Sequence, residues 1–158
     1  MADAVTDPQS GPRAGVPASG PDGLMIFDGV CNFCSANVRL LLHIDRAGAI
    51  RFASMQSPYG SHLAARHGLD PADPSTFVFF EAGRALFESD AVLAMLARLP
   101  VPWRWLRAVR HVPRPWRDAA YCWIARNRYR LFGRRDACMV PSPADRARFV
   151  EAIPPGEA

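Results

Sequence analysis

The segment that most limits how this 158-residue chain can fold is "LMIFDGVCNFCSANVRLLL", residues 24–42. A short apolar run ends at Asp28, which is typical of a buried strand followed by a turn. Apolar residues then recur at spacings of three and four before Gly48, which predicts a helix with a glycine at its C-terminal end. Cys31 and Cys34 fall between the two elements, so a Cys-x-x-Cys pair is expected at the start of the first helix.

The remaining apolar pattern predicts a β-α-β-α-β-β-α order for a core over residues 24–99. The last two β-rich runs flank Ala82-Gly83, as the strands of a hairpin do. This is the order of the α/β fold of thioredoxin/glutaredoxin-like proteins, although such short elements also suit other α/β topologies. The further strands are predicted at 49–54, 76–80 and 84–88, and the further helices at 57–68 and 89–99, with Ser89 as the N-cap of the last.

Two flanking segments differ from this core in composition. Residues 1–23 are rich in Pro, Gly, Ala and Ser and have almost no large apolar side chain, which predicts a disordered N-terminal tail. Residues 100–153 predict a helical, Arg-rich C-terminal extension packed on the core. Within it we expect a short helix, a longer one at about 115–132 and a last short one at 143–153. The length suits one domain with such an addition.

The N-terminal tail and the lengths of the apolar runs indicate where in the cell the protein is located. The tail lacks the basic start and the apolar stretch of a secretory signal, and no apolar run approaches the roughly 18 residues of a membrane span. We therefore expect a cytoplasmic protein without a membrane span. In that compartment, four cysteines are more often reduced, catalytic or metal-bound than joined as structural disulfides.

The position of the cysteine pair favours thiol chemistry. Free N–H groups and the positive end of the dipole at a helix N-terminus would stabilise a thiolate at Cys31. Cys34 follows one turn later, close enough to attack a mixed disulfide on Cys31 and release the reduced substrate. The residues thus predict a dithiol/disulfide couple, with Cys31 as nucleophile, Cys34 as resolving thiol, and neither a cofactor nor a metal.

Other interpretations of the pair compete with this one. A zinc site would need further clustered ligands, whereas Cys122, Cys138 and the four His are scattered. The two cysteines could also be small buried residues, although the polar Asn32 between them argues against it. A haloacid dehalogenase nucleophile at Asp28 is excluded, because those proteins need a second Asp where this chain has Val30.

The string "DGVCNFC", residues 28–34, resembles the signature of the DCC family of predicted thiol-disulfide oxidoreductases, named for its Asp-Cys-Cys pattern. The resemblance continues through "RFASMQS", through Ser89-Asp90-Ala91 and into "RDAAYCWIARNRYRLFGRRDACMVPSP", and it covers about residues 24–149. It implies a thioredoxin-like fold and activity on a protein or small-molecule disulfide or thiol, with glutathione as one option. It does not supply a specific substrate.

The resemblance also implies roles for site residues. Cys31 and Cys34 would be the attacking and resolving thiols, and Asp28 the family's acidic position. A carboxylate there could accept the Cys34 proton as a general base, or cap the turn by bonding backbone N–H groups. Thioredoxins carry a cis-proline before the third strand; here Pro74 is displaced, so Ser75 or Thr76 is expected in that place. The predicted substrate-binding residues are Asn32, Phe33, Ser75, Thr76, Ser89 and Asp90.

Two more cysteines lie near the C-terminal end. Cys138 follows Arg134 and Arg135, whose charges favour a thiolate, so it is either a third redox thiol or a cysteine packed in a loop. Cys122 belongs to the apolar pattern of a helix, and we expect it in the core.

Positive charge is concentrated in one part of the chain. Between Arg98 and Arg135 there are eleven Arg and one acid, Asp118, so this segment carries +10 in a chain of net charge +4. Aromatic residues are interleaved with the Arg, which fits nucleic acid or another anionic surface. The same composition fits aromatics packed on the core beneath solvated Arg heads, or recognition of an acidic partner or an anionic thiol. A nucleic-acid or anion-binding module, with a structural or zinc-bound Cys-x-x-Cys, is therefore the alternative function.

Overall fold

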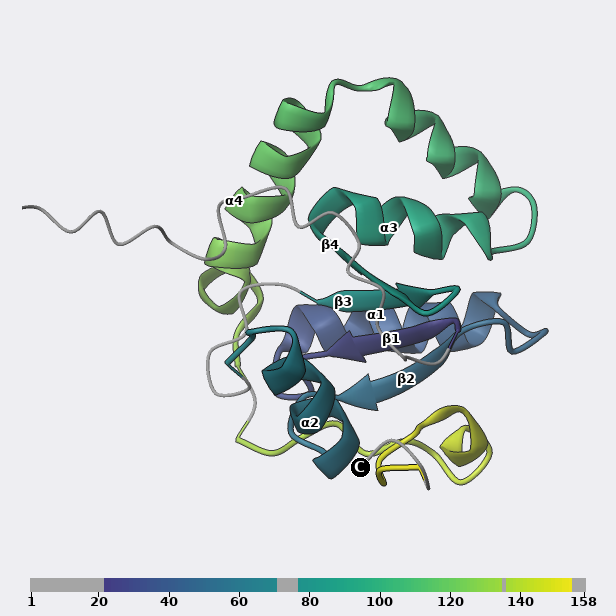
Figure 1. Cartoon of the computed structure of the whole chain (residues 1–158), viewed down its shortest axis with the longest axis vertical. Coiled ribbons are helices and arrows are strands. Elements are labelled where there is room, and N and C mark those ends of the chain that lie inside the picture. Colours follow the sequence, from purple (N-terminus) through teal and green to yellow (C-terminus); the bar gives the residue numbers. More distant parts are fainter. Residues whose placement is uncertain (1–21, 71–76, 135, 155–158) are drawn as a thin grey trace, which may run out of the picture.

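Four short strands form one mixed sheet in the computed structural model of the chain, which describes residues 22–70, 77–134 and 136–154. The order across the sheet is β2-β1-β3-β4 (Figure 1). Strand β1 pairs parallel with β2 and antiparallel with β3, and β3 pairs antiparallel with β4. The bounds of β1 to β4 are Leu24–Phe27, Arg51–Ser54, Val78–Glu81 and Arg84–Phe87.

Three helices complete the core: α1 (Asn32–Ile44), α2 (Pro58–Arg66) and α3 (Glu88–Ala97). The order from β1 to α3 is β-α-β-α-β-β-α, so the predicted thioredoxin-like α/β fold is confirmed. Because α1 connects two parallel neighbours, β1 and β2, its N-terminus lies at the carboxyl end of β1. The topology therefore places the cysteine pair at one end of the sheet.

The sheet is buried on both faces, which explains why β1 is apolar at every position. Leu24 and Ile26 belong to the core cluster under α2, while Met25 and Phe27 belong to the cluster under α1 and α3. Alternate residues of a strand point to opposite faces, so four consecutive apolar residues supply both clusters.

The start of α3 differs from the prediction. This helix begins at Glu88 after Phe87, and no side chain caps it, so the assignment of Ser89 as N-cap was wrong. The Ser89 hydroxyl instead donates a hydrogen bond to the carboxylate of Asp118 in the C-terminal extension. The Ser89 hydroxyl, which local sequence preference predicts as a helix cap, thus forms a tertiary contact instead.

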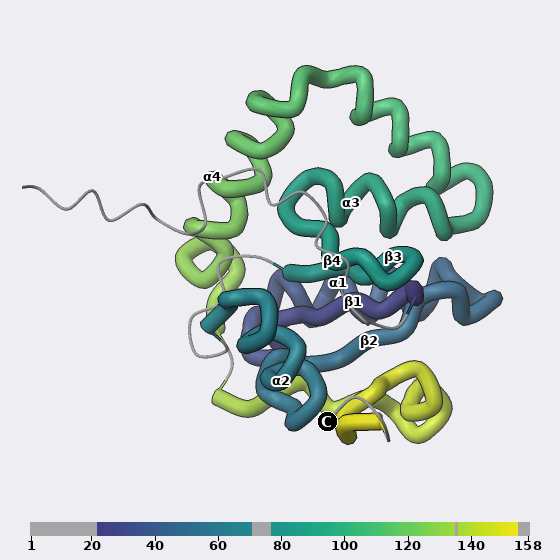
Figure 2. The backbone as a smooth tube through the Cα atoms, viewed as in Figure 1, coloured from purple at the N-terminus to yellow at the C-terminus, as the bar shows by residue number. Residues whose placement is uncertain are grey.

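The extension rises from the end of α3 and returns to the sheet as an arch, residues 103–132 (Figures 1 and 2). It consists of the 3₁₀ helix η1 (Trp103–His111) and the long helix α4 (Arg114–Phe132). The structure describes every residue of the arch, and Arg128 alone among them is buried. Cys122 is only half-buried, so it is not the core residue that was predicted.

The C-terminal segment runs along β2. Phe149 pairs with Phe52 in an isolated bridge, and the Val150 N–H donates to the Phe52 carbonyl at 2.8 Å. Arg148 forms an ion pair of 2.7 Å with Asp45 at the end of α1. The predicted helix at 143–153 was wrong, because this pairing keeps the chain extended and only a 3₁₀ turn, η2 (Arg146–Arg148), forms.

The N-terminal end of the described chain continues β1. The Gly23 N–H donates to the Phe80 carbonyl and the Gly23 carbonyl accepts from the Arg51 N–H, both at 2.7 Å. Asp22 of the predicted tail accepts the Ala82 N–H at 2.7 Å, and residues 1–21 lie outside the described residues. Within the described ranges, no helix has the length and apolar character needed to cross a bilayer.

Candidate active site

A tight turn links β1 to the cysteine pair. The Cys31 N–H donates to the Asp28 carbonyl at 3.3 Å, and the Gly29 N–H donates to Gln56 Oε1 at 2.9 Å. A Cβ on Gly29 would lie 2.4 Å from Cys138 Sγ, closer than any real Cβ contact. Glycine is therefore required here because the chain after α4 passes directly over the turn.

Cys31 is the N-cap of α1. Its backbone is extended (φ −80°, ψ 122°), and its Sγ accepts the Cys34 N–H at 3.3 Å. The pKa of Cys31 is lowered to about 6, chiefly because the Cys34 thiol donates a hydrogen bond to its thiolate. The Cys34 N–H and the positive charge of Arg128 act in the same direction, while burial and the charge of Asp28 oppose them.

Cys34 has the opposite character. Its hydrogen bond to Cys31 raises the pKa of the Cys34 thiol, and burial and the negative charge of Cys31 raise it further. The pair therefore holds one thiolate and one thiol at neutral pH. The fully buried Cys31 is the thiolate, and the half-buried Cys34 is the thiol.

The carboxylate of Asp28 lies beneath the pair in a dense set of hydrogen bonds. Its Oδ1 accepts from Gln56 Nε2 at 2.9 Å and from the Val30 N–H at 3.2 Å. Its Oδ2 accepts from the Tyr129 hydroxyl and lies 3.6 Å from the Arg128 guanidinium. Asp28 and Arg128 are 3% and 8% exposed at the side chain, so both charges are almost fully desolvated and each compensates the other.

Arg128 and Tyr129 connect α4 to this carboxylate. Arg128 also donates to the Ala125 carbonyl at 2.7 Å, and its guanidinium lies 4.6 Å from the centre of the Tyr129 ring. Burial, followed by the hydrogen bond to Asp28, raises the pKa of Tyr129 to about 12, so its hydroxyl remains a donor. Neither residue is among the predicted site residues, although both fall in the C-terminal string that resembles the family.

Residues 132–134, which we name the cover segment, lie across the start of α1. Asn32 Nδ2 donates to the Phe132 carbonyl at 2.9 Å, and the Asn32 N–H donates to the Gly133 carbonyl at 3.4 Å. The rings of Phe33 and Phe132 stack with their centres 4.7 Å apart. The two residues between the cysteines, predicted to bind substrate, thus contact the chain's own C-terminal extension.

The cover segment also reaches the first cysteine. Cys31 forms an isolated antiparallel bridge with Arg134, and its side chain is fully buried. Cys34 is instead half-buried and lines a cavity between α1 and the arch. The sulfur with the lowered pKa is therefore buried, and the pair is open to that cavity on the Cys34 side.

The other predicted substrate-binding residues lie further along the chain. Ser89 lines the same cavity, and Asp90 forms an ion pair of 2.9 Å with Arg114 of α4. Both residues of α3 therefore contact α4 through side chains. Ser75 and Thr76 lie outside the described residues, so the substitution of one of them for a cis-proline stays a prediction.

Cys138 packs against the turn. Its Sγ lies 3.1 Å from Ser54 Oγ, and it is half-buried.

In the part of the chain that the structure describes, no three His, Cys, Asp or Glu side chains gather as they would around a metal ion.

Comparison with known proteins agrees with this geometry. The family model of the DCC1-like thiol-disulfide oxidoreductases matches residues 25–134. The uncharacterized protein YuxK of Bacillus subtilis is 39% identical over 130 residues, which cover 82% of this chain and 95% of YuxK. A chloroplastic DCC family protein of Arabidopsis thaliana is also 39% identical, over 116 residues that cover 73% of this chain and 67% of the plant protein. No solved structure matched the chain.

Proposed function

Because the chain belongs to the DCC1-like thiol-disulfide oxidoreductase family, we propose that Cys31 and Cys34 are its redox-active pair. The observation that carries the proposal is the thiolate site at the start of α1, where the Cys34 thiol and N–H both donate to Cys31 and lower its pKa to about 6. A thiol with such a pKa is mostly ionised at pH 7 and is the nucleophile of disulfide exchange.

The reaction would proceed in two steps. The Cys31 thiolate attacks one sulfur of a substrate disulfide; the substrate S–S bond breaks and one substrate thiolate leaves and takes up a proton. Cys34 then loses its proton and attacks Cys31 Sγ, which breaks the mixed disulfide and releases the second substrate thiol. Two electrons pass to the substrate, and a Cys31–Cys34 disulfide remains.

The first step prepares the second. The Cys34 pKa is raised chiefly by its hydrogen bond to Cys31, with a further contribution from the charge of Cys31. Once Cys31 is in a mixed disulfide, its negative charge is gone, so the Cys34 thiol becomes easier to ionise. The Cys34 thiol therefore stays protonated in the resting pair and ionises more easily only after Cys31 has reacted with substrate.

We assign Asp28 as a positioning residue. Both of its carboxylate oxygens accept hydrogen bonds in the resting site, and one of these comes from the Val30 N–H of the turn. Asp28→Asn should then change the pH at which Cys31 reacts. Were Asp28 instead the base for Cys34, the same variant would accumulate the Cys31 mixed disulfide, which mass spectrometry detects.

The substrate contacts of Asn32, Phe33, Ser75, Thr76, Ser89 and Asp90 stay predictions, as does a cytoplasmic location. A protein disulfide would need the cover segment to move away from Cys31, because that side chain is fully buried. A cell fractionation with an antibody to the native protein tests the location directly.

The decisive experiment titrates the purified protein against glutathione redox buffers, alkylates it and measures the masses of peptides that contain Cys31 and Cys34, with a zinc assay on the same sample. We expect a reversible two-electron couple without zinc, lost in Cys31→Ser and kept in the matched control Cys122→Ser. Stoichiometric zinc, or cysteines that neither pair nor react in the folded protein, would contradict the proposal.

A second role rests on the charge of the arch. Arg104, Arg110 and Arg126 are exposed, in a segment that carries a large excess of positive charge. Anion or nucleic-acid binding there would be additional to the dithiol chemistry. Retention on immobilised DNA that falls steeply between about 50 and 200 mM salt would support it, and passage without retention at the lower salt would reject it.

A further inference from the structure

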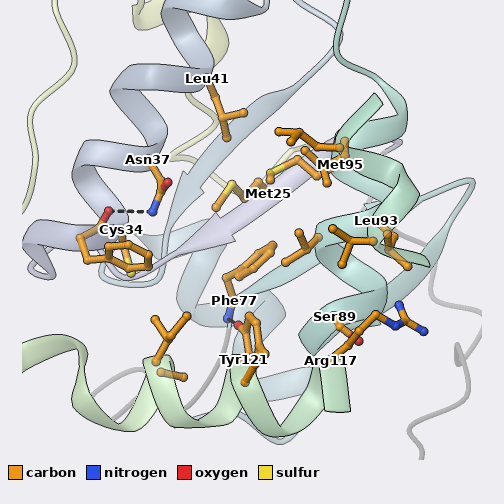
Figure 3. A pocket seen from close by; sticks show the side chains of 18 of the residues that line it. Met25, Cys34, Asn37, Leu41, Phe77, Ser89, Leu93, Met95, Arg117 and Tyr121 are labelled. Carbon is orange, nitrogen blue, oxygen red and sulfur yellow. Dashed lines mark hydrogen bonds between the residues drawn. The ribbon is translucent and has the colours of Figure 1, made fainter. Parts of the chain in front are cut away.

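A cavity of about 640 Å³ lies between α1, α3 and the arch and reaches Cys34 (Figure 3). Its volume is typical of small-molecule sites, which range over about 300–1,000 Å³. In the close view, side chains from several elements surround it, including Met25 of β1, Leu41 of α1, Leu93 of α3 and Tyr121 of α4. Most of the lining is aliphatic or aromatic, which favours an apolar occupant.

Several polar side chains at its border have partners within the protein, although Arg117 Nη1 is buried without a hydrogen bond among the described residues and lies 4.0 Å from Asp90. Asn37 Nδ2 donates to the Phe33 carbonyl at 3.0 Å, and Arg117 Nε donates to the Val112 carbonyl at 3.0 Å. The Tyr121 hydroxyl accepts the Phe77 N–H at 3.2 Å.

The charged groups nearest the cysteines are paired in the same way. Arg128 and Asp28 compensate each other at 3.6 Å, so the Cys31 thiolate is the uncompensated charge near that end of the cavity. A molecule with several charges, such as glutathione disulfide, would lose its hydration in the cavity without gaining comparable bonds. The lining therefore selects against charged ligands.

The cavity also provides access to the pair. Cys31 is fully buried under the cover segment, whereas Cys34 is half-buried and lines the cavity. A molecule in the cavity thus meets the pair on the Cys34 side without displacing the cover segment.

We propose that this cavity binds the substrate, a small, uncharged, apolar disulfide whose sulfurs lie against Cys34, and that the neighbouring Cys31 Sγ, which does not line the cavity, turns toward the substrate to attack it. This inference rests on the proposed function and adds the substrate class to it. The reaction is the one given above. The substrate S–S bond is cleaved to two apolar thiols, and the Cys31–Cys34 bond forms. One proton of the two product thiols comes from Cys34 and the other from solvent.

The test uses two disulfides of nearly equal shape, di-n-propyl disulfide and bis(2-hydroxyethyl) disulfide, with glutathione disulfide as the charged comparison. The reduced protein is mixed with each, and the rate at which the Cys31–Cys34 disulfide forms is divided by the rate of free dithiothreitol with the same compound. We expect the propyl compound to react about tenfold faster than the hydroxyethyl compound, and glutathione disulfide to react slowest.

Two neighbouring alanines of α4 supply matched variants. Both are exposed, but Ala120 lines the cavity and Ala119 does not. Ala120→Trp should fill the space and reduce the propyl preference toward one, while Ala119→Trp should keep the preference of the native protein. In the Cys31→Ser background, Ala120→Trp should abolish binding of the uncharged fluorophore N-phenyl-1-naphthylamine, whereas Ala119→Trp should keep it. This binding measurement reports on the cavity without any redox step.

Several results would overturn the inference. Equal normalised rates for the three disulfides, or a preference that survives Ala120→Trp, would show that the dithiol acts but that the cavity does not select its substrate. A concentration-dependent dimer that buries Ala120 would assign the cavity to a second copy of the chain. If no disulfide oxidises the pair, the proposed function itself fails, and the substrate assignment fails with it.

Discussion

The α2 face of the sheet and the arch both carry many large apolar side chains, but only the α2 face buries them. Under α2, Tyr59, Leu63 and Phe80 are no more than 1% exposed. In the arch, Trp105 and Trp116 are each 73% exposed. The apolar residues of the α2 face therefore stabilise the fold, whereas those of the arch form the wall of a cavity and an open surface.

This difference teaches what the extension is for. The arch, which the structure describes in full, contributes one buried side chain, Arg128, and that side chain lies at the cysteine site. Residues 132–134 cover the first cysteine, and the rest of the arch closes the cavity that reaches the second. The arch and the cover segment thus shape access to the dithiol, whereas Met139 and Phe149, further along the extension, pack in the core.

The sharpest test of this contrast compares one aromatic residue from each region. Phe80→Ala should lower the free energy of unfolding by about 3–5 kcal/mol, because it opens a void in the closed core. Trp105→Ala should change it by less than about 0.5 kcal/mol, because the ring is mostly solvated. Urea unfolding measures both, and a large loss in Trp105→Ala would mean that the arch is part of the core.

The buried residue of the arch provides the second test. Arg128→Met leaves the Asp28 carboxylate without its countercharge, which should cost about 3 kcal/mol of unfolding free energy. The loss of positive charge should also raise the pKa of Cys31, so its alkylation by iodoacetamide should require a higher pH. Arg126→Met, exposed on the same helix, is the control, and an unchanged pH profile in Arg128→Met would remove Arg128 from the site.

The third test follows the thiolate itself. Alkylation of Cys31 should have its midpoint near pH 6 and slow about tenfold for each unit below it, because only the thiolate reacts. The pKa of Cys31 is lower in the folded protein than its unfolded value near 9. The thiolate therefore stabilises the folded protein fully above pH 9, and this stabilisation is lost as the pH falls through 6. The reduced native protein should therefore gain stability over Cys31→Ser between pH 6 and 9, and a flat difference would contradict the lowered pKa.

The smallest expected effect concerns the cover segment. Gly133 has φ +83°, and a Cβ there would lie 3.1 Å from Asn32 Nδ2, whereas Gly48 has φ +73° with nothing within 4 Å. Both substitutions to Ala should cost about 1 kcal/mol through backbone strain. Only Gly133→Ala should also speed the alkylation of Cys31, by a few-fold, because it disturbs the cover. Equal rates in the two variants would show that the cover segment does not limit access.

The sequence predicted those parts of the molecule that depend on local pattern. Apolar alternation, turn residues and the Cys-x-x-Cys spacing were enough for the order of elements and for the place of Cys31 at a helix start. The same information failed at Ser89, whose hydroxyl bonds Asp118 instead of capping its own helix, and at 143–153, where pairing with β2 replaces a helix.

The rest of the site depends on contacts that no local pattern encodes. Arg128 has the appearance of one more Arg in a basic helix, and only the fold brings it to Asp28, a hundred residues earlier in the chain. Gln56 likewise reaches Asp28 from the loop after β2. The covered state of Cys31 and the cavity beside Cys34 arise from the way the arch closes on α1, which composition alone did not indicate.

The separation along the chain between the dithiol and its cover matters while the protein is being made. Asn32 and Phe132, which hold the cover in place, are 100 residues apart. At synthesis rates of about 5–20 residues per second, the cysteines precede their cover by roughly 5–20 seconds. During that interval a nascent chain carries its two thiols without the lid that later shields the first of them, so each newly made molecule is open to mispairing or oxidation before it is complete.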